Sequence, residues 1–112
     1  MTPEGRIQKS ILEYLNLIGA FVWRNNTTGI YDVRKKCFRR NNGNNSAVGS
    51  SDILGIYKGT FLALEVKTKY GKTTPYQQLF IDKINQRGGI AGVCKSVDDV
   101  IELLKKPRYI AE

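Results

Sequence analysis

The pattern of apolar and polar residues predicts a helix near the start of the chain. Thr2 is suited to cap this helix, Pro3 to occupy its first position and Gly19 to end it. The helix would bury one face, which carries Ile7, Ile11, Leu15 and Ile18. Residues 20–24 then fit a short strand, and residues 30–40 fit a basic hairpin.

Two strands at residues 52–57 and 60–66 have the clearest pattern in the sequence. Lys58 and Gly59 lie between them and fit a tight two-residue hairpin turn. The second strand has apolar residues at successive positions over 61–64, which is typical of a central strand buried on both faces.

The last third of the chain predicts a helix, a strand and a final helix. The first helix covers residues 75–87 and follows Thr74, and the strand covers residues 90–94. Ser96 is suited to cap the final helix, with Asp99 completing a capping box.

This order predicts one α/β domain over residues 1–112, with a mixed β-sheet flanked by helices. The elements follow the order α-β-β-β-α-β-α, without an internal repeat or a linker. Trp23, in the first strand, is expected in the core rather than as a platform for stacking bases.

The composition of the chain limits which partners and catalytic mechanisms are compatible with it. The 112 residues carry a formal net charge of +8, which suggests a polyanionic partner such as nucleic acid; the alternative is a merely soluble basic domain. The sequence has no histidine, which excludes Ser-His-Asp and Cys-His catalysis and zinc sites of the histidine type. Cys37 and Cys94 lie far apart and are expected to be reduced thiols. No signal peptide or membrane-spanning run is recognisable, so we expect a cytoplasmic protein without a membrane partner.

Two carboxylates should face each other across the predicted hairpin. If Lys58 and Gly59 form the turn, Asp52 falls opposite Glu65, and strand alternation puts Lys67 on the same face as Glu65. Facing carboxylates repel each other, and a cation between them would relieve the repulsion. Oxygen ligands alone point to Mg²⁺ or Mn²⁺. The alternative is an ordinary ion-pair cluster at a strand end on the surface.

Two helical residues carry polar groups toward the same region. Glu4 extends the apolar stripe of the first helix, although an acid there also favours the helix dipole. Gln77 shares a face with apolar residues of the second helix, although Thr74 and Gln77 also form a capping box. The outer face of that helix would carry Gln78, Asp82 and Asn85.

The ordered set of motifs resembles the VRR-NUC family of the PD-(D/E)xK nuclease superfamily, which includes Holliday-junction resolvases. The resemblance rests on Gly49-Ser50-Ser51-Asp52-Ile53-Leu54-Gly55, Leu64-Glu65-Val66-Lys67 and Thr74-Pro75-Tyr76-Gln77, together with Glu4-x-x-x-Gln8, Trp23-Arg24-Asn25-Asn26 and Ser96-Val97-Asp98-Asp99-Val100. It covers nearly the whole chain and implies a restriction-endonuclease-like fold. One departure is Ser51, which stands where the superfamily signature has proline.

The resemblance also implies a role for each site residue. Asp52, Glu65 and the Val66 carbonyl would hold Mg²⁺, for which Mn²⁺ would substitute, and Glu4 would add a direct or water-mediated ligand. Lys67 would orient the attacking water or stabilise the pentavalent transition state. Gln77 would position Lys67 or the scissile phosphate.

Basic residues outside this site are candidates for contacts with the DNA backbone. The densest cluster lies in the predicted hairpin and consists of Arg34, Lys35, Lys36, Arg39 and Arg40. Arg24 ends the first strand near the site, and Lys69 and Lys72 lie in the loop after Lys67. The alternative for the cluster is a solvated hairpin surface.

These observations favour a divalent-metal-dependent DNA endonuclease that selects branched or junction DNA, and the resemblance implies a homodimer. The alternative from another class is a non-catalytic DNA-binding module that retains the nuclease fold. A basic scaffold that binds RNA or protein is a third hypothesis, but it leaves the facing carboxylates without a role.

Overall fold

The first helix begins and ends where the apolar pattern predicts. In the computed structural model, which describes residues 1–25, 30–32, 37–39, 49 and 51–107, α1 spans Pro3–Leu17. The Thr2 hydroxyl accepts a hydrogen bond from the Gly5 N–H at 3.0 Å, which satisfies a free amide of the first turn. Ile11 and Leu15 are fully buried, so the predicted apolar face is the face that packs.

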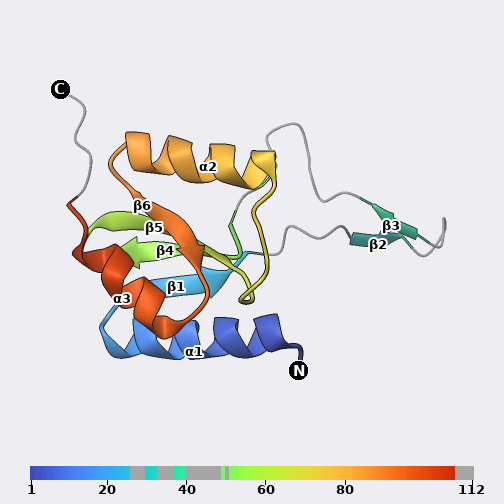
Figure 1. The fold of residues 1–112 in the computed structure, drawn as a ribbon, viewed down its shortest axis with the longest axis horizontal. Coiled ribbons are helices and arrows are strands. Elements are labelled where there is room, and N and C mark those ends of the chain that lie inside the picture. The colour runs from blue at the N-terminus through green and yellow to red at the C-terminus, as the bar shows by residue number, and fades with distance from the viewer. Residues whose placement is uncertain (26–29, 33–36, 40–48, 50, 108–112) are drawn as a thin grey trace.

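Four strands form the main sheet, in the order β1-β4-β5-β6 (Figure 1). Their bounds are Phe21–Arg24, Ile53–Tyr57, Thr60–Val66 and Ile90–Cys94. The β1–β4 and β4–β5 pairs are antiparallel and the β5–β6 pair is parallel. The mixed sheet predicted from the sequence is therefore confirmed, with β5 buried in its centre.

The β4–β5 hairpin has the predicted register. Tyr57 pairs with Thr60 and Ile53 pairs with Leu64. The turn residues Lys58 and Gly59 have φ angles of 50° and 77°, the left-handed pair that a two-residue turn requires when it follows the twist of its strands. Glycine adopts this conformation without a side-chain clash, which explains why the turn falls at this position.

A second, two-stranded sheet consists of β2 (Ile30–Asp32) and β3 (Cys37–Arg39). The strands are antiparallel and pair Ile30 with Arg39, which confirms the predicted hairpin. Figure 1 draws this hairpin to one side of the main sheet.

Helices cover the two faces of the main sheet unequally (Figure 1). α1 and α3 (Val97–Lys105) pack on one face, over a core that includes Leu62, Leu64 and Val66. α2 (Pro75–Gln86) packs on the opposite face, against β5 and β6. These elements give the order α-β-β-β-α-β-α for the main sheet and its helices. No helix of the described ranges is long and apolar enough to cross a bilayer.

α2 packs mainly on β5 and β6, and large apolar side chains on the same face of β1 and β4 remain exposed. Trp23 is 42% exposed, and Phe21 and Ile56 are more exposed still. The expectation that Trp23 lies in the core is therefore wrong. The sequence pattern marks an apolar residue in a strand, but it does not show that no helix covers that part of the sheet.

Two predictions of helix capping and facing need correction. The Ser96 hydroxyl accepts from the Asp99 N–H at 3.2 Å, but the Asp99 carboxylate accepts from the Lys95 N–H rather than from Ser96. Asn85 does not lie outside with Gln78 and Asp82, because its amide bonds both the N–H and the carbonyl of Ala91 at 2.9 Å. The side chain therefore ties the end of α2 to the start of β6.

Candidate active site

Asp52 and Glu65 meet at the end of the β4–β5 hairpin, as the register predicts. Asp52 directly precedes Ile53, whose partner Leu64 directly precedes Glu65. The backbone of Asp52 is also paired on its other side, since its carbonyl accepts from the Asn25 N–H at 2.7 Å. Asp52 is therefore held between β1 and β5.

The Asp52 carboxylate is held by the neighbouring strand. Its Oδ2 atom accepts a hydrogen bond from the Val66 N–H at 2.8 Å. The Asn25 amide also donates to the Ser51 carbonyl at 3.1 Å, which fixes the backbone just before Asp52. The sequence predicts Asn25 as a weaker candidate for a DNA contact, and its positioning of the Asp52 backbone is a finding of the structure.

Glu65 is buried, and only one of its two carboxylate oxygens has a polar partner among the described residues. The residue is 2% exposed, yet its Oε2 atom has no hydrogen-bond partner among the described residues. The Oε1 atom accepts from the Gln77 amide at 3.0 Å and lies 3.5 Å from the Lys67 ammonium. An unpartnered carboxylate oxygen in a buried position is unfavourable unless a further group binds it.

Burial, and after it the nearby Asp52 carboxylate, raise the pKa of the Glu65 carboxyl from 4.5 to about 7. Lys67 acts in the opposite direction and lowers this pKa. These features suit a cation-binding carboxylate: it is desolvated, it faces a second acid, and its Oε2 atom has no hydrogen-bond partner among the described residues.

Gln77 caps α2 and also contacts the candidate site. Its side-chain oxygen accepts from the Thr74 N–H at 2.9 Å and the Gln77 N–H donates to the Thr74 hydroxyl, which completes the capping box. Its amide nitrogen donates to Glu65, whereas the resemblance implies a contact with Lys67 or the phosphate. The cap fixes the side chain that holds Glu65.

Gly49 brings the preceding chain against the start of α2. Its φ angle is +80°, and a Cβ atom there would lie 2.5 Å from the backbone carbonyl of Tyr76 and 2.7 Å from the backbone nitrogen of Gln77. Only glycine fits both the conformation and the space. This close approach packs the segment before Asp52 on the turn that carries Gln77.

The donor set fits a divalent cation. Two carboxylates, one with an unbound buried oxygen, form an oxygen-only site of the kind that Mg²⁺ and Mn²⁺ prefer. Over the described ranges, no group of three or more His, Cys, Asp or Glu side chains is close enough to hold a metal. Glu4 therefore does not join Asp52 and Glu65 as a third carboxylate. It lines a surface hollow with Gln8 and Thr68, and its water-mediated contribution stays a prediction.

The VRR-NUC domain model matches residues 3–98, a span that contains Asp52, Glu65, Lys67 and Gln77. The chain belongs to the VRR-NUC domain family.

A solved structure of a VRR_NUC domain is similar to this VRR-NUC chain over 94% of its length and 97% of that chain, with a TM-score of 0.64 and 24% sequence identity. At this identity the likeness concerns the fold, and it confirms the mixed α/β architecture. No curated protein matches the chain. The VRR-NUC domain is a nuclease-type domain, so a nuclease fold carries the site described above.

In this VRR-NUC chain, the two roles of Gln77 can be separated by substitution. Gln77→Glu keeps an oxygen for the Thr74 N–H but removes the donor to Glu65, whereas Gln77→Ala removes both. We expect both variants to slow DNA cleavage at least about tenfold, or ~1.4 kcal/mol of barrier. Only Gln77→Ala should also lose the cap, at a cost of up to about 1 kcal/mol in the free energy of unfolding.

Gln78→Ala is the matched control for that measurement. Gln78 is exposed, and its side chain donates to the Asp82 carboxylate at 2.9 Å and accepts from the Thr73 hydroxyl at 3.5 Å. Its substitution should leave single-turnover cleavage rates and melting temperature nearly unchanged. A Gln77→Glu protein that cuts at the normal rate would reduce Gln77 to a helix cap.

The raised pKa of Glu65 predicts how stability depends on pH in chelator. Between pH 4.5 and about 7 the carboxyl is protonated in the folded protein but ionised in the unfolded chain. The folded state then binds more protons, so its stability falls as the pH rises through this window. The loss should be on the order of 1 to 3 kcal/mol.

Urea unfolding at pH 4.5, 6 and 8, each in chelator, measures this dependence. In the Glu65→Gln protein the fall should disappear, and Mg²⁺ should reverse it in the unsubstituted protein at pH 8. An equal fall in both proteins would assign it to other groups.

The structure describes only some of the basic residues that are predicted to contact DNA. Arg24, Lys69 and Lys72 are exposed, the first at the end of β1 and the others in the loop that follows Lys67. The carbonyl of Lys69 accepts from the Lys95 ammonium at 2.8 Å, which ties this loop to the end of β6. Arg39 lies in β3, while Arg34, Lys35, Lys36 and Arg40 lie outside the described residues.

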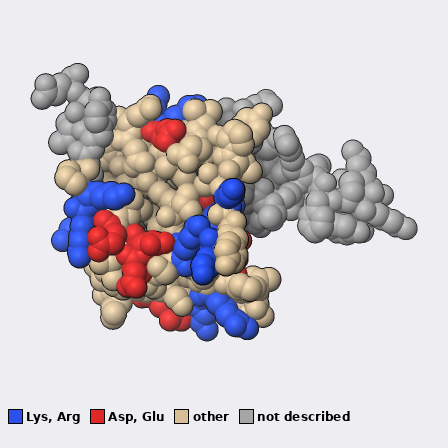
Figure 2. All heavy atoms as spheres, in the orientation of Figure 1, with Lys and Arg blue, Asp and Glu red and all other residues tan. Residues whose placement is uncertain are grey.

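The face that carries α3 is not a basic surface. Figure 2 shows Lys and Arg side chains next to Asp and Glu side chains there. The first turn of α3 carries Asp98 and Asp99, and further along Lys105 lies 3.5 Å from Glu102. An interspersed surface of this kind gives no field of one sign with which to attract a polyanion.

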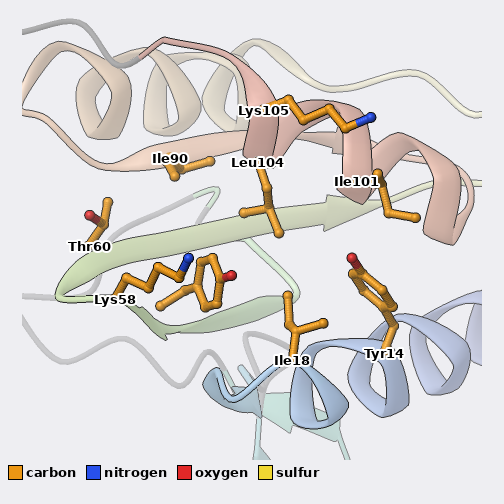
Figure 3. A pocket seen from close by; sticks show the side chains of 9 residues that line it. Tyr14, Ile18, Lys58, Thr60, Ile90, Ile101, Leu104 and Lys105 are labelled. Carbon is orange, nitrogen blue, oxygen red and sulfur yellow. The ribbon is translucent and has the colours of Figure 1, made fainter.

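A separate hollow of about 370 Å³ lies at the turn end of the β4–β5 hairpin, away from the carboxylates. In Figure 3, Tyr14 and Ile18 from α1 and Ile101 and Leu104 from α3 line it. Lys58 and the other lining residues include no carboxylate. The hollow therefore lacks the groups that bind a hard metal ion, and the candidate active site is the Asp52–Glu65 pair.

Cys94 does not compete with this site as a nucleophile. Cys94 is a buried free thiol at the end of β6. Burial, with a smaller contribution from Asp99, raises the pKa of this thiol to about 12. A thiol of this kind is protonated and unreactive at neutral pH.

Proposed function

We propose that the chain is a divalent-metal-dependent DNA endonuclease that cleaves phosphodiester bonds and selects branched or junction DNA. The observation that carries the proposal is the buried Oε2 atom of Glu65, which has no partner within the described ranges and lies across the hairpin from Asp52. A hydrolase that has no histidine needs another source of an activated nucleophile, and a pair of carboxylates with a metal supplies one.

Asp52 and Glu65 would hold the cation through their carboxylate oxygens, including the unpartnered Oε2 atom of Glu65. The Val66 carbonyl and a water-mediated contact from Glu4 would complete the set that the VRR-NUC resemblance implies. When bound, a divalent cation supplies charge that offsets the phosphate and lowers the pKa of a coordinated water.

Lys67 and Gln77 both hold the Glu65 carboxylate. Both contact the Oε1 atom of Glu65, and this arrangement leaves Oε2 directed away from them and free to bind. The Lys67 side chain is 17% exposed, so a phosphate beside the site would reach it. Its fixed positive charge would stabilise the negative charge that develops on the phosphate during attack.

The DNA backbone would contact exposed basic residues, chiefly Lys69 and Lys72 in the loop after Lys67, and Arg24 at the end of β1. The basic hairpin would extend the contact through Arg34, Lys35, Lys36, Arg39 and Arg40. A homodimer would bring two sites to the two strands of a junction, as the family resemblance implies.

A panel of labelled DNAs tests the proposal. A Holliday junction, a flap and a linear duplex are incubated with Mg²⁺, with Mn²⁺ and with chelator. We expect cleavage of the branched DNAs with either metal and none in chelator, with Glu65→Gln as the inactive control. Cleavage in chelator would exclude the metal-dependent mechanism, and equal cleavage of linear duplex would exclude structure selectivity. Tight DNA binding without any cleavage would identify a non-catalytic DNA-binding module instead.

A further inference from the structure

An exposed strip of apolar side chains lies on the same sheet face as the candidate active site. Phe21 and Trp23 alternate on β1, and Ile56 of β4 pairs directly with Phe21. Their exposed fractions are 71%, 42% and 46%. A contiguous apolar patch of this kind on a small protein marks a binding surface more often than a chance exposure.

The strip is continuous with the carboxylates. Trp23 pairs with Leu54, and the next residues of the same face along these two strands are Asn25 and Asp52. Residues two apart on a strand lie on the same face, about 7 Å from each other. Trp23 is therefore about 7 Å along β1 from Asn25, the residue beside Asp52. A ligand that reaches the site along this face must pass over Trp23 and Phe21.

The geometry of the two rings suits flat ligands. Their centroids are 5.5 Å apart and their planes are tilted by 54°, so the rings do not stack face to face on each other. The tilt leaves ring faces available to a third planar group, and nucleobases are the planar groups of a polyanion. The chain carries a net charge of +8, which attracts a polyanion such as DNA more strongly than a protein partner with few acidic residues.

We propose that Phe21, Trp23 and Ile56 form a stacking platform for unpaired nucleobases of DNA, which leads a single-stranded segment to the Asp52–Glu65 site. This inference rests on the proposed function and extends it, because it names DNA with unpaired bases as the substrate class. A platform for unpaired bases favours flaps and opened junctions, whose bases are free to stack, over fully paired duplex.

Binding measured in chelator tests the platform without cleavage. Trp23 is the single tryptophan of the chain, so its fluorescence reports directly on the strip. We expect an oligothymidylate to quench this fluorescence, while a blunt duplex binds with much less quenching. Phe21→Ala, at a highly exposed position, should weaken oligothymidylate binding by at least about fivefold in anisotropy titrations. Blunt-duplex affinity should be unchanged.

Two further variants keep the test sharp. Trp23→Ala should weaken binding as Phe21→Ala does, whereas Trp23→Phe keeps a ring and should restore most of the affinity. Leu17→Ala changes an apolar residue that is 84% exposed on α1, and it should leave both affinities unchanged. Circular dichroism melts confirm that each variant is folded.

Each contrary result has a distinct meaning. Unchanged oligothymidylate affinity in Phe21→Ala and Trp23→Ala would overturn the platform. Sedimentation that shows a dimer dissociating in these variants, with oligothymidylate affinity retained, would assign the strip to a second copy of this chain. If the unsubstituted protein cleaves no DNA yet shows the quenching and the variant losses, the proposed function fails while the platform stands.

Discussion

Glu65→Gln and Asp52→Asn are each expected to abolish DNA cleavage while making the metal-free protein more stable. Removal of a group that only supports a metal ligand costs 10- to 100-fold, so loss of a ligand should cost more than about a hundredfold. In Glu65→Gln the introduced amide keeps an oxygen for Gln77 and Lys67 and places a donor toward Asp52. It also removes a buried charge that faces a second acid, for a gain of about 1 kcal/mol in the free energy of unfolding.

Thermal melts in chelator at pH 8 measure the gain, since the Glu65 carboxyl with its pKa of about 7 is ionised there. Single-turnover cleavage with Mg²⁺ measures the loss. Glu13→Gln is the matched control, because Glu13 is an exposed acid on α1 and its substitution should change neither quantity much. Full cleavage activity in either site variant would end the assignment of these carboxylates to the active site.

Lys67→Ala should lose cleavage by at least about a hundredfold while DNA affinity falls only by a small factor. The ammonium contributes fixed charge near the reacting phosphate, a contribution made mainly in the transition state. It is one positive charge among many, so it adds little to the affinity that the whole basic surface provides.

Lys69→Ala and Lys72→Ala are the controls for this separation. Both residues are exposed in the loop after Lys67. Their loss should weaken DNA binding and its dependence on salt slightly, with little effect on the single-turnover rate. A Lys67→Ala protein that binds DNA far more weakly but cuts bound DNA normally would make Lys67 a binding residue only.

Much of the fold could be predicted from local chemistry. Thr2, Thr74 and Ser96 cap the three helices as their positions indicate, because a short polar side chain before a helix satisfies a free amide there. The Lys58-Gly59 turn sets the hairpin register and therefore the pairing of Asp52 with Glu65. The main features of the candidate site follow from this one local element.

Other features depend on contacts between segments that are far apart in the sequence. Which atom Gln77 holds depends on where α2 docks, since the spacing along the chain is equally compatible with Lys67 or Glu65 as its partner. The hydrogen bonds from the Asn85 side chain to the Ala91 backbone also depend on how α2 docks. For this reason the predicted outward orientation of Asn85 was wrong.

Caps, turns and strand alternation act over a few residues, so the helices, the hairpin register, the family and the identity of the acids could be predicted from the sequence. The tertiary structure was needed to show that Oε2 of Glu65 has no partner among the described residues, that Glu4 lies apart from the carboxylate pair and that Trp23 is exposed. Burial and coverage depend on how α2 docks on β5 and β6, and this docking is set by packing between distant segments rather than by any local pattern.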